Sequence, residues 1–402
     1  MRIGVAMAVT ERGSLRFGNI KLSNWRNFKK ADVALQGRVF VIGPNASGKS
    51  NFLDCFRFLH DLVSFGGGFQ EAVGRRGGVS KLRCHAARRN PDVEIDVRIV
   101  DADGKERWKY TLGFKQNKMS IPLIVKEEII RGGKKKIVMR PDEDDNADQE
   151  RLRQTALEQV NVNKEFRELV DFFRSVRYLH LVPQLIREPE RYRSVSERSP
   201  FRSEYDPFGG DFLDRIASVN KKTRDAWLRR IGDALKLVVP QLKELEFYRD
   251  EKLGVPHLRA KFEHWRPQGA WQTEEQFSDG TLRLIGLLWS VLEKGGPLLL
   301  EEPELSLHPA IVRHLPAMFA RMQQRSGRQV LLSSHSADIL QDEGIALDEV
   351  LILKPGREGT EIVLASSIDE VHNLVENGIP LADVALSESR PSRPEQLPLF
   401  VK

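Results

Sequence analysis

Cysteine is scarce in this chain, which carries only Cys55 and Cys84 among its 402 residues. Two cysteines make no disulfide framework, and no spacing of Cys and His resembles a zinc site. Apolar runs are short as well, well below the roughly 20 residues of a membrane span. The first residues hold only a very short apolar run before Glu11, which argues against a signal peptide. We therefore expect a cytoplasmic protein with no membrane partner.

A strong excess of either charge is also missing. Lys and Arg number 63 against 57 Asp and Glu, which gives a formal charge of +6 and a pI of about 9.2. This mildly basic balance permits contact with nucleic acid, and a solvated surface with excess arginine explains it equally well. The hydrophobic share of 40% and the charged share of 30% are typical of a soluble globular protein.

Strand and helix patterns alternate along the chain, which predicts an α/β fold. Residues 38–43, RVFVIG, are typical of a buried strand, and residues 48–63 have apolar positions at helical spacing. Residues 92–140 alternate as an antiparallel sheet does, with turns at paired Asp-Gly and Gly-Gly. Residues 211–242 are amphipathic at helical spacing, which indicates a helical sub-domain.

A glycine-rich loop follows the first buried strand. Its sequence, GPNASGKS, fits the pattern G-x-x-x-x-G-K-[ST] between a strand and a helix. Such a loop turns successive N–H groups toward phosphate oxygens, Lys49 would reach the β- and γ-phosphates, and Ser50 would place its hydroxyl on Mg²⁺. The alternative is a chance glycine-rich turn. The expected nucleotide contacts are Gly43, Pro44, Asn45, Ala46, Ser47, Gly48, Lys49, Ser50 and Asn51.

Two adjacent glutamates end another apolar strand, in the run PLLLEEPELSLHP. Like charges at the end of a buried strand repel and resist desolvation. A bound cation and a reacting water would make the pair favourable, so we assign Glu301 to the metal and Glu302 to polarising the attacking water. The alternative is an exposed acidic loop after a core strand.

Two weaker signals accompany these motifs. Ser278 and Gly280 stand at the start of a predicted helix, FSDGTLRLIGLL, where a small hydroxyl and a glycine offer an anion site. A plain helix cap at Ser278 is the alternative. His335 follows the strand in LLSSHS, where it could donate to a γ-phosphate oxygen or hold the water. A purely structural histidine is the alternative.

The order of these motifs resembles that of the ABC-type ATPases. More closely, the chain resembles the SMC/RecF-like branch: stand-alone P-loop ATPases related to RecF and to the ATPase part of OLD-family nucleases. The stretches that carry the resemblance are NWRNFKKADVAL for the opening strand, SDGTLRLIGLL for the signature helix, EEPELSLHP for Walker B and D-loop, and SSHS for the H-loop. They cover roughly residues 15–60 and 270–360.

This resemblance implies an ABC/SMC-type P-loop NTPase head with an antiparallel β sub-sheet and an inserted helical lobe. The corresponding division has four parts: the first part of the head at 1–140, the lobe at 141–270, the second part of the head at 271–386, and a disordered tail at 387–402.

The resemblance also implies ATP and Mg²⁺ as cofactors and two nucleotide sites between two heads. Ser278 and Gly280 would then serve the partner's ATP, and the D-loop, residues 305–309, would face the partner. Gln184 would report on Mg²⁺. Two departures from the family pattern stand out: Glu301 replaces the usual Asp, and Asp279 replaces a glycine of the signature.

The function expected from this resemblance is a slow ATPase that dimerises with a second copy and acts on or near DNA, in repair, genome maintenance or defence against foreign DNA. DNA binding without sequence specificity would use basic stretches around residues 74–89 and 187–202. The alternative is a nucleotide-gated sensor or scaffold that controls a separately encoded effector such as a nuclease or toxin. ATPase service to a partner other than DNA is a third option.

The tail SRPEQLPLF resembles the short peptide by which many bacterial DNA-acting proteins dock on the replication sliding clamp. In that interpretation Leu397, Leu399 and Phe400 fill an apolar pocket and Gln396 hydrogen-bonds at its rim. The alternative is a tail that folds back on its own head.

Overall fold

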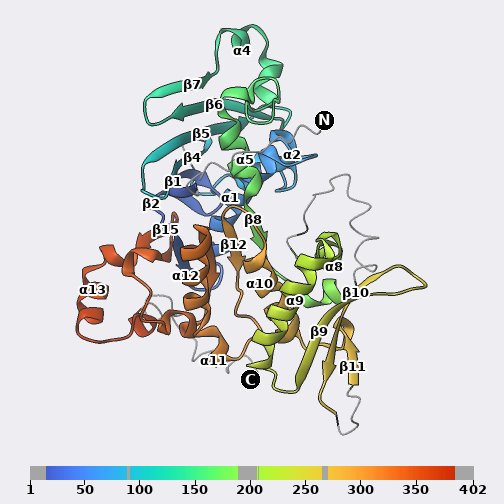
Figure 1. Ribbon diagram of the computed structural model, residues 1–402. Helices are drawn as coiled ribbons and strands as arrows, with labels where there is room; N and C mark the ends of the chain where they lie inside the picture. Colours follow the sequence, from blue (N-terminus) through green and yellow to red (C-terminus); the bar gives the residue numbers. More distant parts are fainter. Residues whose placement is uncertain (1–14, 88–90, 189–205, 207, 265–269, 385–402) are drawn as a thin grey trace, which may run out of the picture.

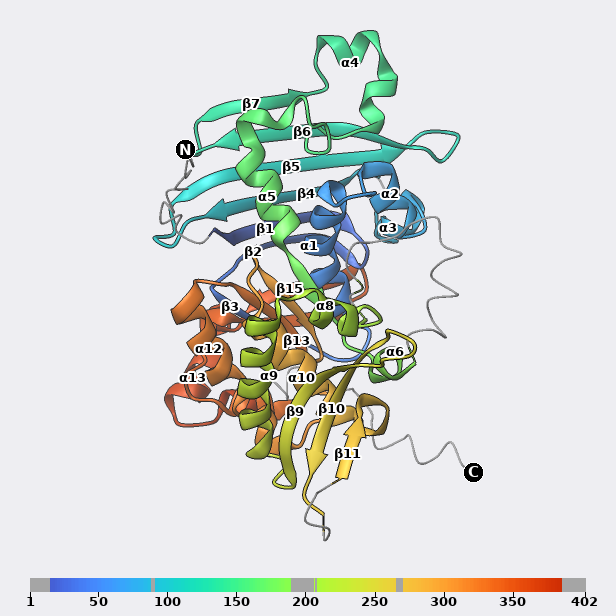
Figure 2. The ribbon, with the colours of Figure 1, turned by 45° about the vertical axis from the view of Figure 1, so that its right-hand side comes forward.

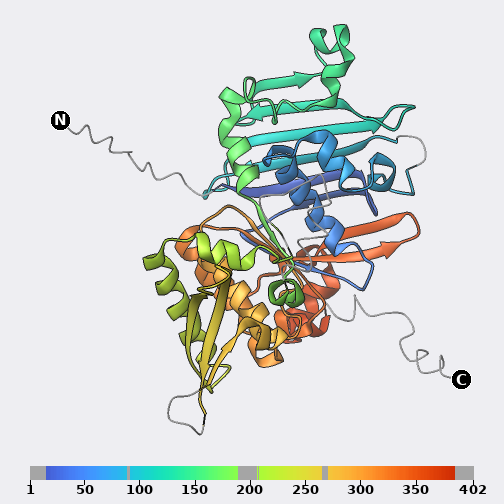
Figure 3. The ribbon, with the colours of Figure 1, turned by 90° about the vertical axis from the view of Figure 1, so that its right-hand side faces the viewer.

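The computed structural model of this protein describes residues 15–87, 91–188, 206, 208–264 and 270–384. Three sheets follow one another along the molecule (Figure 1). An antiparallel sheet lies at one end, a mostly parallel sheet lies in the middle, and a small lobe with its own sheet lies at the other end, as Figure 3 also shows. Within the described ranges, no helix has the length and apolar character needed to cross a membrane.

The sheet at one end confirms the expected antiparallel sub-sheet. Its strand order is β2-β1-β4-β5-β6-β7, and all neighbours are antiparallel. The strands are β1 (Arg16–Trp25), β2 (Phe28–Ala34), β4 (Val93–Val100), β5 (Glu106–Gln116), β6 (Pro122–Arg131) and β7 (Lys135–Arg140).

The middle sheet has the order β15-β14-β3-β13-β12-β8 and is parallel except for its edge strand β15. Because the carboxyl ends of parallel strands meet at one edge, the segments after β3, β8, β12 and β13 gather there. The strands are β3 (Arg38–Ile42), β8 (Arg177–Leu179), β12 (Leu298–Glu301), β13 (Val330–Ser334), β14 (Val350–Gly356) and β15 (Gly359–Leu364).

The five parallel strands of the middle sheet each contribute to two separate cores, since successive side chains point to opposite faces. In β3, Val39 and Val41 join the core between the middle and antiparallel sheets, together with helix α1 (Lys49–Val63). Phe40 and Ile42 of the same strand join the core on the other face. This alternation inside an all-buried strand explains why the sequence there is continuously apolar.

The other helices cover these sheets. Helices α1 and α5 pack against each other beside the antiparallel sheet (Figure 2). The helices are α2 (Phe69–Gly74), α3 (Val79–Leu82), α4 (Glu143–Ala147), α5 (Arg167–Ser175), α6 (Pro183–Arg187), α10 (Asp279–Leu292), α11 (Pro309–Val312), α12 (Leu315–Ser326) and α13 (Asp369–Glu376). Single 3₁₀ turns lie at Gln149–Arg153, Asn163–Phe166, Glu274–Gln276, Ala337–Gln341, Leu347–Glu349 and Ala365–Ser367.

The lobe contains the expected helices and also a sheet that the sequence analysis did not predict. Helices α8 (Phe212–Ser218) and α9 (Lys221–Lys236) accompany an antiparallel sheet of order β11-β10-β9. Its strands are β9 (Leu242–Arg249), β10 (Pro256–Phe262) and β11 (Ala270–Thr273). The division at residues 140, 270 and 386 stays a prediction. Within the range 141–270, strand β8 belongs to the middle sheet rather than to the lobe.

A close packing between the segment after β8 and helix α10 gives a test of the fold. A Cβ added at Gly286 of α10 would lie 2.1 Å from Leu181 Cδ1. We therefore expect Gly286→Val to lower the free energy of unfolding by roughly 1–3 kcal/mol through overpacking. Gly74→Val is the matched control, because nothing lies within 4 Å of a Cβ at Gly74. Urea titrations of both variants measure the difference, and equal losses would contradict this packing.

Candidate functional site

The glycine-rich loop forms a tight turn between β3 and α1. Ser47 N donates to the carbonyl of Pro44 at 3.2 Å, and Ala46 and Gly48 both have positive φ, 63° and 99°. A Cβ at Gly48 would lie 2.0 Å from the side-chain nitrogen of Asn27, so only glycine fits there. The loop thus brings backbone N–H groups to the amino end of α1, which is the arrangement that binds phosphate.

Lys49 uses all of its hydrogen-bonding capacity within the protein. Its ammonium donates to the carbonyls of Gly43 (2.9 Å) and Pro44 (3.1 Å) and lies 3.2 Å from Nδ1 of His335. A lysine ammonium has three donors, and all three are engaged. Burial lowers the pKa of Lys49, while nearby glutamates, Glu302 first among them, oppose that shift.

Glu301 receives two hydroxyl groups. Ser50 Oγ donates to its Oε1 and the Tyr178 hydroxyl donates to its Oε2. Burial raises the pKa of Glu301, and the neighbouring charge of Glu302 raises it further, against the hydrogen bond from Ser50. A carboxylate and a serine hydroxyl in contact are the oxygen ligands that Mg²⁺ prefers, and a cation would relieve the cost of the buried charge. These residues therefore fit the expected metal.

Glu302 is connected through His335 to Lys49. His335 Nε2 lies 2.6 Å from Glu302 Oε1, while Nδ1 of the same ring faces Lys49. Because the lysine ammonium only donates, Nδ1 accepts and Nε2–H donates to Glu302. Glu302 also has a positive φ of 46°, and its N–H donates to the carbonyl of Ser333 at 3.0 Å. This backbone hydrogen bond ties the end of β12 to β13 and so keeps the side chains of Glu302 and His335 close together.

Glu304 also belongs to this network, although no role was expected for it from the sequence. It is only 8% exposed and accepts from Ser334 Oγ at 2.5 Å and from His335 N at 3.1 Å. Burial raises its pKa, and the hydrogen bond from Ser334 opposes the shift. Glu304 thus fixes the backbone that carries His335. Its place in the same EEPE run as Glu301 and Glu302 was the sequence signal that could have assigned it to the site.

Ser278 and Gly280 lie at the start of α10, as expected. Ser278 Oγ accepts from Thr281 N at 3.2 Å and pairs with Thr281 Oγ1 at 2.8 Å, so it caps the helix. A Cβ at Gly280 would lie 2.4 Å from the carbonyl oxygen of Ser306. Among the described residues, neither Ser278 nor Gly280 hydrogen-bonds to the glycine-rich loop. A role toward a second chain stays a prediction.

Gln184 is exposed on α6, and within the described ranges its side chain makes no hydrogen bond to this network. Two other residues contact Glu301 instead, one within β8 and one directly after it. Tyr178 contacts its carboxylate, and His180 Nδ1 lies 3.3 Å from its backbone oxygen. Both follow from the pairing of β8 with β12, which no local pattern reveals. The metal role of Gln184 stays a prediction.

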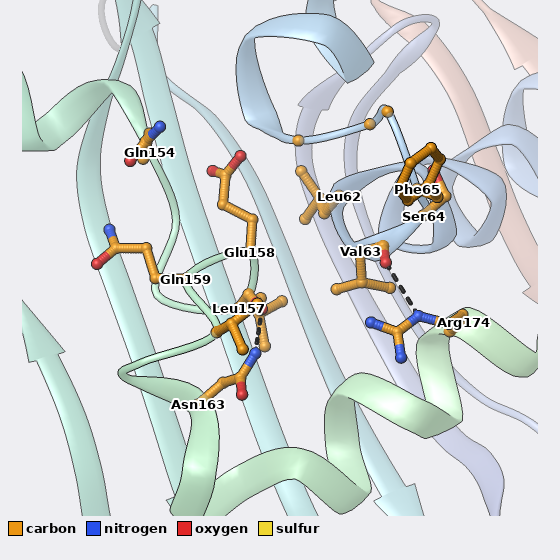
Figure 4. A pocket seen from close by; sticks show the side chains of 14 residues that line it. Leu62, Val63, Ser64, Phe65, Gln154, Leu157, Glu158, Gln159, Asn163 and Arg174 are labelled. Carbon is orange, nitrogen blue, oxygen red and sulfur yellow. Dashed lines mark hydrogen bonds between the residues drawn. The ribbon is translucent and has the colours of Figure 1, made fainter. Parts of the chain in front are cut away.

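A cavity of about 580 Å³ lies at the other end of α1, away from the glycine-rich loop (Figure 4). Glu158 points into it, but its carboxylate already accepts from Thr155 N and Phe69 N. Arg174 at its edge donates to the carbonyl of Val63 at 3.2 Å. None of the residues predicted for the site lines this cavity.

Comparisons with known proteins find partial relatives of this chain. This chain is 36% identical to an Endonuclease GajA of Bacillus cereus (strain VD045) over 67 residues, which are 17% of this chain and 12% of that relative. Over 114 residues, 25% of this chain, it is 32% identical to the DNA replication and repair protein RecF of Lactobacillus gasseri. The chain thus spans only 12% and 27% of the lengths of these relatives.

A solved structure resembles the whole fold. The Smc head domain with a coiled coil and joint from Pyrococcus yayanosii superimposes with a TM-score of 0.50 at 13% identity, over 90% of this chain and 99% of that one. At this identity the likeness concerns the fold, and it confirms the expected ABC/SMC-type head.

A family model matches residues 38–341, from β3 through the segment after β13. That range holds the glycine-rich loop, both glutamates and His335. The chain therefore belongs to the family described as AAA domain, putative AbiEii toxin, Type IV TA system, and it is an SMC/RecF-like ABC-type P-loop ATPase.

Proposed function

We propose that this protein binds ATP and Mg²⁺, hydrolyses ATP slowly, dimerises head to head around two ATP molecules, and acts on or near DNA in repair, genome maintenance or defence against foreign DNA. The observation that carries the proposal is the connected group Lys49, His335 and Glu302 beside Ser50 and Glu301, at the edge where the glycine-rich loop ends β3. This group supplies a phosphate-binding cation, a base and two metal ligands.

The residues divide the work of in-line attack by water on the γ-phosphate. Lys49 would exchange the carbonyls of Gly43 and Pro44 for phosphate oxygens. Glu302 would accept a proton from the attacking water, with His335 holding its carboxylate in place. Ser50 and Glu301 would hold Mg²⁺, which neutralises phosphate charge when bound. Ser278 and Gly280 would complete the site of a partner chain.

The proposed action on DNA rests on what the partial relatives are, a replication and repair protein and an endonuclease. One expected contact needs correction: Arg76 is 8% exposed and pairs with Asp54 and Asp61, so it is not available to DNA. Among the described residues of that stretch, Lys81 is exposed and Arg83 is partly exposed. In the expected run at 187–202, Arg187 pairs with Asp279 at 2.6 Å, and residues 189–202 lie outside the described residues. The proposed clamp peptide with Gln396, Leu397, Leu399 and Phe400 also lies outside them.

The family description favours a second candidate. It names a putative toxin of a toxin–antitoxin system, which fits a nucleotide-gated sensor that controls a separately encoded effector such as a nuclease or toxin. The ATP site would be the same in both cases, so only the output distinguishes them.

Glu302→Gln tests the proposed chemistry. The variant should bind ATP as the wild type does, lose at least about 100-fold in hydrolysis rate, and accumulate as an ATP-bound dimer in light scattering. Glu343→Gln, an exposed acid distant in sequence, is the control and should behave as wild type. Hydrolysis by Glu302→Gln at the wild-type rate would remove Glu302 from the role of base.

Tyr178→Phe tests the support of the metal ligand. The ring and its contact with the Arg57 guanidinium, 5.1 Å from the ring centre, remain, while the hydroxyl that donates to Glu301 is lost. We expect Mg²⁺ to bind about tenfold more weakly in the presence of nucleotide. Magnesium titrations of a fluorescent ATP analogue measure this, with Tyr248→Phe on the lobe as the control. An unchanged titration would show that Ser50 alone suffices.

Fluorescence anisotropy with random duplex DNA separates the two candidates for output. If DNA is bound, affinity should fall steeply between low and moderate salt because counterions are released. The double variant Lys81→Ala/Arg83→Ala should weaken binding, while Lys221→Ala/Arg229→Ala on exposed α9 positions serves as a charge-matched control. An absence of binding at low salt would favour the effector-controlling sensor.

A further inference from the structure

Asp279 puts a negative charge where the proposed function needs an anion to arrive. It is the first residue of α10 and lies between Ser278 and Gly280, the two residues proposed to meet the γ-phosphate of a partner's ATP. The amino end of a helix attracts anions, but a carboxylate at the same place repels a phosphate. Some other group must therefore compensate for this charge.

Arg187, the last residue of α6, makes that compensation directly. Its Nη2 lies 2.6 Å from Asp279 Oδ1 and 2.6 Å from the carbonyl oxygen of Phe277. The side chains of Arg187 and Asp279 are 21% and 39% exposed, so the pair is only partly screened by solvent. One guanidinium thus bridges the residues on both sides of Ser278.

A second cation near Asp279, Arg283, also interacts with two other acidic residues. Arg283, one turn further along α10, is half-buried and also lies within the electrostatic reach of Glu302 and Glu304. Among the described residues, Arg187 makes the short contact with Asp279 and forms an ion pair with no other acid. Within the part of the chain that the structure describes, Arg187 is therefore the cation placed to neutralise Asp279.

Helix α6, which carries Arg187, is packed firmly against α10. Pro183 begins α6, and Ile186 is 1% exposed. Leu181, just before this helix, packs directly on Gly286 of α10. The guanidinium is thus presented from a fixed support to the start of the helix, which is the condition for positioning a binding group.

We propose that Arg187 is a positioning residue that neutralises Asp279 and holds the start of α10, so that Ser278 and Gly280 can accept the γ-phosphate of an ATP bound to a second copy of this chain. The inference rests on the proposed function, because it needs the site between two chains. It assigns a reason to the acidic residue at position 279, where the family pattern has glycine.

The experiment is a charge cycle on the full chain. Arg187→Ala should raise the ATP concentration for half-maximal hydrolysis and for dimerisation about tenfold, with ATP binding to the monomer unchanged. Asp279→Asn keeps the shape of the side chain and removes its charge, so the double variant Arg187→Ala/Asp279→Asn should return to within about twofold of wild type. Arg187→Lys should lie between, since it keeps the charge and loses the planar fork.

Matched controls separate this role from general stability. The exposed lobe pair Arg259 and Glu246, 2.6 Å apart, receives the same substitutions, Arg259→Ala and Glu246→Gln, and should leave the ATP dependence unchanged. Ser278→Arg marks the full loss of the site between chains. Thermal unfolding of every variant shows whether a change in ATP dependence accompanies a change in folding.

If the wild type dimerises with ATP, two results would overturn this inference and leave the proposed function standing. In the first, Arg187→Ala has the ATP dependence of the wild type. In the second, Arg187→Ala needs more ATP and the added substitution Asp279→Asn does not restore the wild-type value. The second result would mean that Arg187 binds phosphate itself rather than neutralising Asp279. A wild type that forms no ATP-dependent dimer would instead overturn the proposed function, and this inference with it.

Discussion

The organisation of the site depends on one electrostatic constraint: two carboxylates, Glu301 and Glu302, follow each other at the end of a buried strand. The chain separates them by giving each a different set of partners. Glu301 receives hydroxyl groups from Ser50 and Tyr178, while Glu302, at a positive φ, turns to His335. The repulsion is thus spread over a network that contains a lysine. The same network carries the proposed metal ligands on one side and the proposed base on the other.

The parallel sheet makes this separation possible. Strands β3, β8, β12 and β13 end at one edge, so residues from four distant parts of the sequence meet there without any of them leaving its own strand end. The two cores on opposite faces fix the strands from both sides. Side chains at the edge are therefore carried by a rigid scaffold, while the loops that bear them stay close to solvent.

Local patterns were sufficient to predict the glycine-rich loop, the strand before Glu301 and the helix after Ser278, because each is encoded in consecutive residues. The contacts of Tyr178 and His180 with Glu301 could not be predicted in this way, since they arise from the pairing of β8 with β12 across more than a hundred residues. Strand β9 was not predicted for another reason. Charged residues such as Lys243, Glu244 and Arg249 interrupt its alternation of polar and apolar residues, so the strand forms through its pairing with β10 despite a weak local pattern.

The absence of room at Gly280 has a consequence for cooperativity. A side chain at position 280 would collide with the Ser306 carbonyl, so the start of α10 and the loop after Glu304 lie close against each other. In a two-fold dimer of the proposed kind, a displacement of one loop by the partner would be transmitted to the helix that serves that partner's nucleotide, and by symmetry back again. Two ligands bound in this way are linked in free energy, so occupancy would rise more steeply with ATP than for two independent sites.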